Sequence, residues 1–358
     1  MNTNKTILII NPGSTSTKVG IFENGKMKIN VSIKHEEAEL RKFASIWDQY
    51  DYRKDAILKF LNDNDLAMEQ IDAIACRAGN IKPISSGIYR ICPKMIEDMK
   101  SGIYGIHPLN VGGMVAFDLG NQYNIPVLTA DPSMTDELCL SARYSGIPQI
   151  SRRSSFHALN QKATAKKVSN ELGKRYDEVN LIVVHLGGGI SVGAHKKGRV
   201  IDVNNALDGD GPFSPERAGS MPTSDLVKMC FSGEYSKEQI LKLLTGGGGL
   251  IAYLGTTNAI EIEKRIAGGN QKAAEVYEAM AYQIAKEIGA CTTVLEGKID
   301  AIALTGSLVY SKVLLDSLLR KISFIAPVHL NPGENEMDAL ADATMRYFNN
   351  EEELSVYN

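Results

Sequence analysis

The fold of this chain can be predicted from the stretch Ile7–Gly20, which has the sequence ILIINPGSTSTKVG. Its first four residues are all apolar, which indicates a buried strand. Pro12 and Gly13 then end regular pairing and open a tight turn that carries four successive hydroxyl side chains, followed by Lys18. Such a turn offers backbone N–H groups, O–H donors and one cation, a combination that suits phosphate oxygens. An ordinary polar hairpin is the alternative for this segment alone.

A second copy of the motif favours the phosphate interpretation. Residues 181–193, LIVVHLGGGISVG, again combine an apolar run, a glycine turn and a second strand. The pentapeptide IDAIA occurs at residues 71–75 and recurs at residues 299–303. Asn11 and His185, which end the two apolar runs, are 174 residues apart, whereas the pentapeptides are 228 apart. The sequence therefore predicts an internal duplication, with 54 extra residues (228 − 174) between the two motifs of the second half.

Length and composition limit the class of protein. The chain has 358 residues, enough for two domains, and its 44% hydrophobic and 23% charged residues are ordinary for a globular protein. A net charge of −3 gives no reason to expect nucleic acid as a partner. Five scattered cysteines predict reduced thiols in the cytoplasm. No apolar run approaches the roughly 20 residues that span a bilayer, so we expect no membrane partner.

Apolar periodicity and turn residues predict the other elements. The expected strands are three between residues 7 and 33, then 71–76, 126–130 and 299–304. The expected helices are 52–61, 94–100, 109–120, 158–172, 223–231, 237–244, 271–296, 309–320 and a last one opened by residues 332–336. Gly246–Gly249 is expected to be a flexible connection, because no helix with a Lys-Ser or Lys-Thr pair follows it.

Three polar residues follow predicted strands and give the first indication of a site. Asn11, Arg77 and Asp131 each stand at the carboxyl end of a strand. Ligands of open α/β sheets bind outside these ends. A surface charge for Arg77 and a plain turn for Asp131 are the alternatives.

Two segments carry a resemblance to a known family. NPGSTSTK at residues 11–18 and HLGGGIS at residues 185–191 look like the signature segments of the acetate and butyrate kinase family. The order of landmarks extends this resemblance along nearly the whole chain. CRAGNIKPI at residues 76–84, AYLGT at residues 252–256 and PGENEM at residues 332–337 resemble butyrate kinases more than acetate kinases.

The resemblance implies a fold of the sugar-kinase and actin-like ATPase superfamily. We then expect α/β architecture in two duplicated actin-like (ribonuclease H-like) domains, with mixed sheets flanked by helices and an active-site cleft between them. The first domain would comprise residues 1–132 plus about 335–358, and the second residues 133–334. The family also implies a homodimer or higher homo-oligomer.

The resemblance implies reversible transfer of the γ-phosphoryl group of ATP to a short-chain fatty acid, most closely butanoate, with Mg²⁺ as cofactor. The acid is ionised at neutral pH, so the site must neutralise and align two anions rather than supply a strong base. Arg77 and Arg217 resemble the two catalytic arginines, whose planar forks suit such anions. His157 resembles a phosphoryl-stabilising histidine, and Asp131 a residue that positions Mg²⁺ or water.

The nucleotide and metal would fall to further residues. Those implied for ATP are Asn11, Ser14, Ser16, Lys18, His185, Gly187, Gly189 and Gly306, and those implied for the metal are Asn11, Asp131, Glu334 and Glu336. Either glutamate could serve. His157 as a helix cap and His185 as a core histidine are the structural alternatives. His35, His107, His195 and His329 are expected to be structural.

The sequence departs from the family pattern at two places. Gln161 stands where acetate kinases have a second histidine, four residues after the first. TTNAI at residues 256–260 replaces the TNDAR of butyrate kinases, which leaves the nucleotide-base pocket open.

Two rival functions are a sugar kinase of the same fold and a non-catalytic ATP-dependent switch. Asn11 argues against the first, because sugar kinases begin this hairpin with an aspartate. Arg77, Arg217 and His157 together argue against the second. The chain length and branching of the acid, and the physiological direction, do not follow from the sequence.

Overall fold

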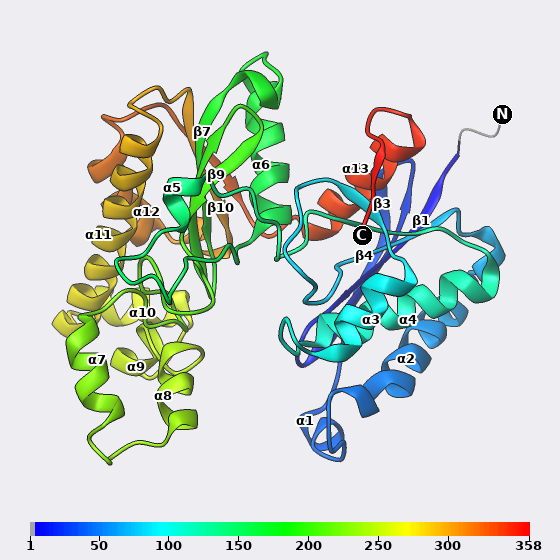
Figure 1. Cartoon of the computed structure of the whole chain (residues 1–358), viewed down its shortest axis with the longest axis horizontal. Helices are drawn as coiled ribbons and strands as arrows, with labels where there is room; N and C mark the ends of the chain where they lie inside the picture. The colour runs from blue at the N-terminus through cyan, green and yellow to red at the C-terminus, as the bar shows by residue number, and fades with distance from the viewer. Residues whose placement is uncertain (1–3) are drawn as a thin grey trace. The chain divides into compact units, whose positions relative to one another are not determined.

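The computed structural model describes residues 4–358, and Figure 1 shows their secondary structure. The chain divides into two compact units. Unit 1 comprises the described residues up to Thr135 together with Asn335–Asn358, and unit 2 comprises Asp136–Glu334. Each unit is built on one mixed sheet with helices packed on it, so the α/β class is the one that the sequence predicts.

Unit 1 contains a seven-stranded sheet in the order β12-β5-β6-β4-β1-β2-β3. The strands are β1 (Thr6–Pro12), β2 (Ser16–Glu23), β3 (Lys26–Lys34), β4 (Ala73–Cys76), β5 (Ile88–Arg90), β6 (Val127–Ala130) and β12 (Leu354–Ser355). The first three form an antiparallel meander, whereas β4 runs parallel to β1 and β6 runs parallel to β4. The carboxyl ends of β1, β4 and β6 therefore lie next to one another.

Helices cover both faces of this sheet. They are α1 (Glu37–Leu40), α2 (Tyr50–Asp63), α3 (Pro93–Ser101), α4 (Pro108–Tyr123) and α13 (Glu336–Phe348). Leu8 and Ile10 of β1 join the core formed with α2, α3 and α4. Because side chains alternate along a strand, Ile7 and Ile9 point to the other face, where α13 packs on β1 and β4. The last helix thus returns to the first unit, as expected.

Unit 2 contains a five-stranded sheet in the order β11-β10-β7-β8-β9. The strands are β7 (Asn180–Leu186), β8 (Ile190–Lys196), β9 (Arg199–Val203), β10 (Ala301–Gly306) and β11 (Val328–Pro332). An antiparallel meander of β7, β8 and β9 is again flanked by a parallel strand, β10, and β11 is parallel to β10. This arrangement repeats the central strands of unit 1.

The helices of unit 2 also cover both faces of its sheet. They are α5 (Leu140–Arg143), α6 (Ala158–Glu171), α7 (Thr223–Cys230), α8 (Lys237–Leu244), α9 (Leu250–Leu254), α10 (Ala259–Ala267), α11 (Gln271–Val294) and α12 (Lys312–Ile322). Leu181 and Val183 pack with α6, and Ile182 and Val184 pack with α11 and α12. Continuous apolar runs in β1 and β7 follow from this burial on both faces.

The strand register confirms the predicted duplication. Ile7 of β1 pairs with Ala73 of β4, and Leu181 of β7 pairs with Ala301 of β10. These partners are related by the same offsets, 174 and 228, that relate the sequence motifs. Both meanders also turn through two residues with positive φ, at Asn24-Gly25 and at Lys197-Gly198. The two turns have the geometry that tight hairpins require.

The helices and strands predicted from the sequence are present, with ends shifted by up to three residues. Short elements were not predicted: β5, β11, β12, α1, α5, α9 and α10. The three strands are only two to five residues long, and each is fixed by pairing with a distant segment rather than by its own pattern.

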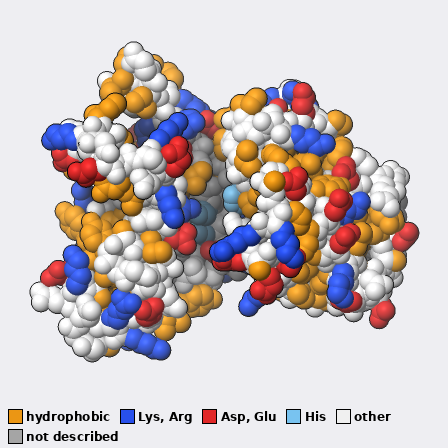
Figure 2. All heavy atoms as spheres, turned by 90° about the horizontal axis from the view of Figure 1, so that it is seen from below, with side chains coloured by type: hydrophobic (Ala, Val, Ile, Leu, Met, Phe, Trp, Pro, Cys, Tyr) orange, Lys and Arg blue, Asp and Glu red, His pale blue; other side chains and the backbone are white. Residues whose placement is uncertain are grey.

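The structure also bears on membrane spans, cysteines and surface charge. Among residues 4–358, no helix is long and apolar enough to cross a membrane. All five cysteines have free thiols. On the face drawn in Figure 2, acidic and basic side chains are interspersed over both units.

Candidate active site

The strand ends of unit 1 bring together three predicted residues. Asn11 follows Ile10 of β1 and Arg77 follows Cys76 of β4, and Ile10 and Cys76 are register partners. Asp131 follows Ala130 at the end of β6, the next strand in the sheet. The sheet therefore places these polar residues at one edge, as its parallel central strands predict.

Glu336, the first residue of α13, connects two of these side chains. Asn11 Nδ2 donates to Glu336 Oε2 at 2.9 Å. Arg77 Nη1 lies 2.8 Å from Glu336 Oε1 and 3.0 Å from Oε2. The side chains of Arg77 and Glu336 are 24% and 12% exposed. Arg77 thus has a counter-ion within its own unit, and the amide of Asn11 is oriented by the same carboxylate.

Asp131 is held in a strained, buried conformation. Its φ is 40°, which places it in the left-handed region that non-glycine residues seldom adopt. Ser86 Oγ donates to Asp131 Oδ1 at 2.5 Å, and Gly87 N donates to the same oxygen at 3.1 Å. Backbone strain of this kind concentrates at functional sites. The geometry is that of a carboxylate positioned by its neighbours rather than a plain turn residue.

The hydroxyl turn of unit 1 is closed by Gly13 N, which donates to Ser16 O at 2.7 Å. Ser14 is exposed, and Lys18 lies directly opposite Asn11 across the β1–β2 pair. A buried arginine that the sequence analysis did not identify supports the turn from behind. Arg53 donates to Ser14 O at 3.1 Å and to Thr17 Oγ1 at 3.2 Å. The turn is therefore fixed by a side chain that lies 36 residues after Thr17 in the sequence.

In unit 2, the glycine turn joins β7 to β8 between Leu186 and Ile190. His185, the residue before Leu186, is buried, and its Nδ1 lies 2.9 Å from Asn160 Oδ1. Its Nε2 lies 3.9 Å from Glu334 Oε1, and a Cβ at Gly187 would be 2.8 Å from the same nitrogen. The ring thus lies against the glycine turn.

Gly306, at the end of β10, lies against Leu186 at the start of the glycine turn. Its φ is 98°, and a Cβ there would lie 2.3 Å from Leu186 O. Gly306 also exchanges two backbone hydrogen bonds with Gly333. Only glycine fits this position. The close approach to Leu186 and the two hydrogen bonds to Gly333 hold these three residues together.

His157 precedes α6 and stacks on His185. The ring centroids are 3.7 Å apart and the planes differ by 10°. Nδ1 of His157 lies 2.9 Å from Ser191 Oγ, and the Cε1–Nε2 edge faces Gly189. His157, His185, Gly187 and Gly189 therefore form one group, although they come from two segments of the sequence.

Arg217 lies in the long loop between β9 and α7. Its Nη1 is 3.3 Å from Glu216 Oε2, whereas its buried Nε has no hydrogen-bond partner among the residues that the structure describes. Ser214 links this loop to the glycine turn, because its Oγ donates to Gly188 O at 2.6 Å and accepts from Arg217 N at 3.1 Å. Ser214 thus links Arg217 to the glycine turn, and the Nε donor of Arg217 stays unsatisfied.

The run Gly246–Gly249 lies next to the loop that carries Arg217. Gly246 N donates to Glu216 O at 2.6 Å, and a Cβ at Gly249 would overlap Ser214 O. Gly248 and Gly249 are buried against this loop, whereas a Cβ at Gly246 would meet nothing within 4 Å, so the expectation of a flexible connection is wrong for the second half of the run. Glycines are needed here because two backbone segments approach each other closely.

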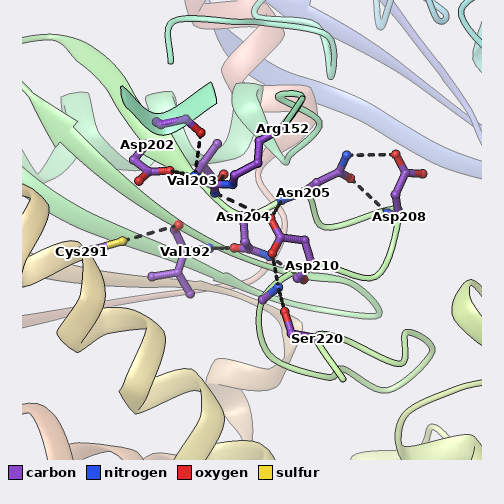
Figure 3. Close-up of polar contacts among 12 residues, drawn as sticks. Arg152, Val192, Asp202, Val203, Asn204, Asn205, Asp208, Asp210, Ser220 and Cys291 are labelled. Atoms are coloured by element: carbon purple, nitrogen blue, oxygen red, sulfur yellow. Dashed lines mark hydrogen bonds and ion pairs between the residues drawn. The ribbon is translucent and has the colours of Figure 1, made fainter. Parts of the chain in front are cut away.

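Figure 3 shows a second set of contacts, which fixes the start of the same loop. Arg152 Nη1 donates to Asp202 Oδ1 at 2.9 Å, and its Nη2 lies 3.6 Å from Asp210 Oδ2. Asn204 accepts from Val192 N at 2.7 Å and donates to Asp210 O at 3.2 Å. The loop is thereby fastened to β8, directly behind the glycine turn.

The metal and base-binding predictions remain predictions. Within residues 4–358, no three His, Cys, Asp or Glu side chains converge on a point that could hold a metal ion. Mg²⁺ needs fewer protein ligands, since it keeps waters and binds substrate phosphates. Asn11 and Glu336 fit such a partial set. At the departure from the butyrate kinase pattern, Asn258 caps α10 by accepting from Glu261 N at 3.2 Å.

Comparison with solved structures establishes the fold. The acetate kinase of Porphyromonas gingivalis matches with a TM-score of 0.76 at 18% identity, over 95% of this chain and 99% of that one. A propionate kinase of Francisella tularensis matches with a TM-score of 0.75 at 19% identity, over 95% and 98% of the two chains. The predicted architecture of two duplicated units, with mixed sheets flanked by helices, is thereby confirmed.

Sequence comparison then gives the family. The family model described as "Acetokinase family" matches residues 139–342. "Butyrate kinase 2" of Clostridium acetobutylicum is 47% identical over 351 residues, which are 98% of this chain and 99% of that protein. This chain belongs to the acetokinase family, and the resemblance inferred from its two signature segments is confirmed.

Proposed function

We propose that this protein is an ATP-dependent carboxylate kinase that converts butanoate and ATP to butanoyl phosphate and ADP, reversibly. Membership of the acetokinase family and the 47% identity to "Butyrate kinase 2" support this substrate class. Acetate, propionate and isobutyrate are the alternative acids. The structural observation that most supports the proposal is the unsatisfied Nε of Arg217.

A buried N–H without an acceptor costs about 1–3 kcal/mol, so it persists where a ligand completes it. An arginine fork suits phosphoryl or carboxylate oxygens, which it contacts with two parallel N–H groups. Arg217 is also fixed by Ser214 to the turn that ends at Gly189.

The reaction needs little proton chemistry. A carboxylate oxygen of the acid attacks the γ-phosphorus, the bond to the β-phosphate oxygen breaks, and the electron pair leaves with ADP. We assign the hydroxyl turn with Lys18, and the glycine turn with His185 and Gly306, to the phosphates of the nucleotide. Arg77, Arg217 and His157 would stabilise the charge on the acid and the transferring group. Asp131, positioned by Ser86, would orient Mg²⁺ or water.

Mg²⁺, when bound, would neutralise negative charge on the phosphates. Asn11 and Glu336 would hold it, directly or through water. Glu336 is favoured over Glu334 because it contacts Asn11, whereas Glu334 lies 3.9 Å from His185.

A hydroxamate assay tests the activity, because hydroxylamine traps acyl phosphates. Purified protein should form butanoyl hydroxamate with ATP and Mg²⁺, and kcat/KM should be higher for butanoate than for acetate. Branched and linear five-carbon acids complete the series. ATP consumption with a sugar but with no carboxylic acid would contradict the proposal, as would ATP binding without turnover.

Paired variants test the metal assignment. Glu336→Gln should raise the Mg²⁺ concentration at half-maximal rate about 10- to 100-fold, which is the usual effect of disturbing a metal's supporting groups. Glu334→Gln, the matched control, should change it less. Titration of activity with MgCl₂ at saturating ATP measures both. A larger shift in Glu334→Gln would transfer the assignment to that residue.

A further inference from the structure

A continuous row of hydrogen bonds runs behind His157 within unit 2. Tyr176 OH lies 2.7 Å from His195 Nδ1, and His195 Nε2 lies 3.0 Å from Gln161 Oε1. Gln161 Nε2 lies 2.7 Å from Ser191 Oγ, which in turn lies 2.9 Å from His157 Nδ1. Gln161 is the residue at which the sequence departs from acetate kinases, so its role needs a local explanation.

The middle of this row is fully buried. Gln161, Ser191 and His195 each have 0% exposure. Buried polar groups without partners are costly, so each hydrogen here must point to an acceptor. The direction of donation can therefore be derived from one end of the row to the other.

The Ser191 carbonyl fixes the orientation of the Gln161 amide. Gln161 Nε2 lies 3.0 Å from Ser191 O, and a backbone carbonyl oxygen can only accept. The NH₂ group must therefore face Ser191, where its second hydrogen reaches Ser191 Oγ. The amide oxygen must then face His195, whose Nε2 carries the hydrogen that it accepts.

His195 supports this direction from the far side. Burial lowers the pKa of His195 well below its usual value, and the charge of Lys162 lowers it further. A neutral His195 with a hydrogen on Nε2 has a lone pair on Nδ1, so Tyr176 OH donates to it. Lys162 itself is buried in an ion pair with Glu137 at 2.7 Å, which keeps a cation beside the ring.

Ser191 transmits the orientation to the catalytic ring. Its Oγ accepts from Gln161, so its own hydrogen is available to His157 Nδ1. We propose that Gln161 and Ser191 are positioning residues that hold His157 in the tautomer with hydrogen on Nε2. This tautomer presents an N–H donor at the ring edge beside Gly189, and its use in phosphoryl transfer rests on the proposed function.

Gly193 provides the space that the arrangement needs. A Cβ at this position of β8 would lie 2.4 Å from Gln161 Oε1 and 3.1 Å from His195 Nε2. The amide and the ring therefore meet over a residue without a side chain. The stacking of His157 on His185 holds the ring plane while the hydrogen bond to Ser191 sets its protonation.

Nitrogen NMR of the histidine-labelled protein without substrates tests the proposal directly. Spectra are recorded about two pH units above the usual histidine pKa of ~6.5, with His157→Gln used to assign the signals. The expected result for the wild type is hydrogen on Nε2 of His157. Hydrogen on Nδ1, or on both nitrogens, at that pH would overturn the proposal. Because no substrate is present, the result does not depend on the reaction catalysed.

Two variants change the direction of donation. In Gln161→Glu both side-chain oxygens accept, so Ser191 should donate to the carboxylate and His157 should move its hydrogen to Nδ1. In Ser191→Ala the fixed donor is lost, and a mixture of tautomers is expected. Ser169→Ala is the matched control, because Ser169 is a buried serine of α6 that donates to Ala165 O instead.

Kinetics give a second measurement. Gln161→Glu and Ser191→Ala should lower kcat about 10- to 100-fold, the range typical of groups that orient a functional residue, while KM for the acid stays near wild type. Ser169→Ala should retain both values. If Gln161→Glu fails to fold, Ser191→Ala decides the outcome. An unchanged tautomer in a folded Ser191→Ala protein would refute the role of the row.

Discussion

The two units place different chemistry on the same frame. In unit 1 the residue that ends the first apolar run, Asn11, bonds to Glu336 at the start of α13. In unit 2 the equivalent residue, His185, bonds to Asn160 in the first turn of α6. Each contact measures 2.9 Å. The two helices occupy equivalent faces, although one follows the duplicated strands and the other precedes them.

The next helix residue shows where the units diverge. Met337 follows Glu336, and its Cε would be 2.8 Å from a Cβ at Gly20. Gln161 follows Asn160 and occupies the same place against Gly193. An apolar side chain suffices in unit 1, whereas unit 2 buries an amide that reaches Ser191 and His195. Because a buried amide is costly unless fully bonded, we infer that it is retained to orient a ring.

The two arginines differ in a similar way. Arg77 has the Glu336 carboxylate within its own unit, so its charge is balanced before any ligand binds. Arg217 has Glu216 at 3.3 Å and a buried Nε that no described residue satisfies. The arginine of unit 1 is therefore paired within its unit, whereas that of unit 2 keeps one buried donor without a partner among the described residues.

The largest effect is expected from removing the unsatisfied arginine. Arg217→Ala should lower kcat about 10²- to 10³-fold, the usual loss for one well-placed donor to a transition state. Arg77→Ala should fall in the same range. Arg153 is the control, because its side chain is 78% exposed in an ion pair with Asp208. The kcat of Arg153→Ala should stay within about twofold of wild type. Steady-state rates of all three variants measure this, and near-wild-type turnover in both site variants would contradict their assigned roles.

An intermediate effect is expected from one substitution made in both units. Gly193→Ala should destabilise the fold by about 1–3 kcal/mol and lower kcat, because the new methyl group displaces the amide of Gln161. Gly20→Ala comes closest to the flexible end of Met337, which can move, and lies 3.2 Å from Ile29 O and from the Phe22 ring, so its cost should be smaller. Urea unfolding and steady-state kinetics compare the two. Equal losses of kcat in both variants would show that the contrast between the units has no functional meaning.

The smallest effect concerns acid stability. Burial, aided by the charge of Arg53, lowers the pKa of His35 to about 4, and burial lowers that of His195 well below 6.5. The unfolded chain binds these protons near pH 6.5, so the free energy of unfolding is full above that pH and falls as pH drops toward 4. Each such histidine adds up to ~1.4 kcal/mol per pH unit to the slope.

Denaturant titrations from pH 7.5 to about 4.5 measure this slope. His195→Gln and His35→Gln should each make it shallower, and the surface variant His329→Gln serves as the control. A slope that is unchanged in both buried-site variants would show that neither histidine is held neutral in the folded protein.

The sequence by itself determined the frame. Apolar runs, glycine turns and the repeated pentapeptide predicted the duplicated meanders, because these patterns are local and their spacing survives in the strand register. The same strand ends located Asn11, Arg77 and Asp131, and the family resemblance pointed to His157, His185 and Arg217.

Only the tertiary structure decided how these residues are held. The contacts of Glu336 with Asn11, of Arg53 with the hydroxyl turn and of Ser214 with Gly188 join segments between 26 and 325 residues apart. No local pattern encodes such partners, since hydrogen bonding depends on where distant backbones meet. Gln161 shows this most clearly: in the sequence it stands where acetate kinases have a histidine, and in the fold it connects His195 and Ser191, which contacts the ring of His157.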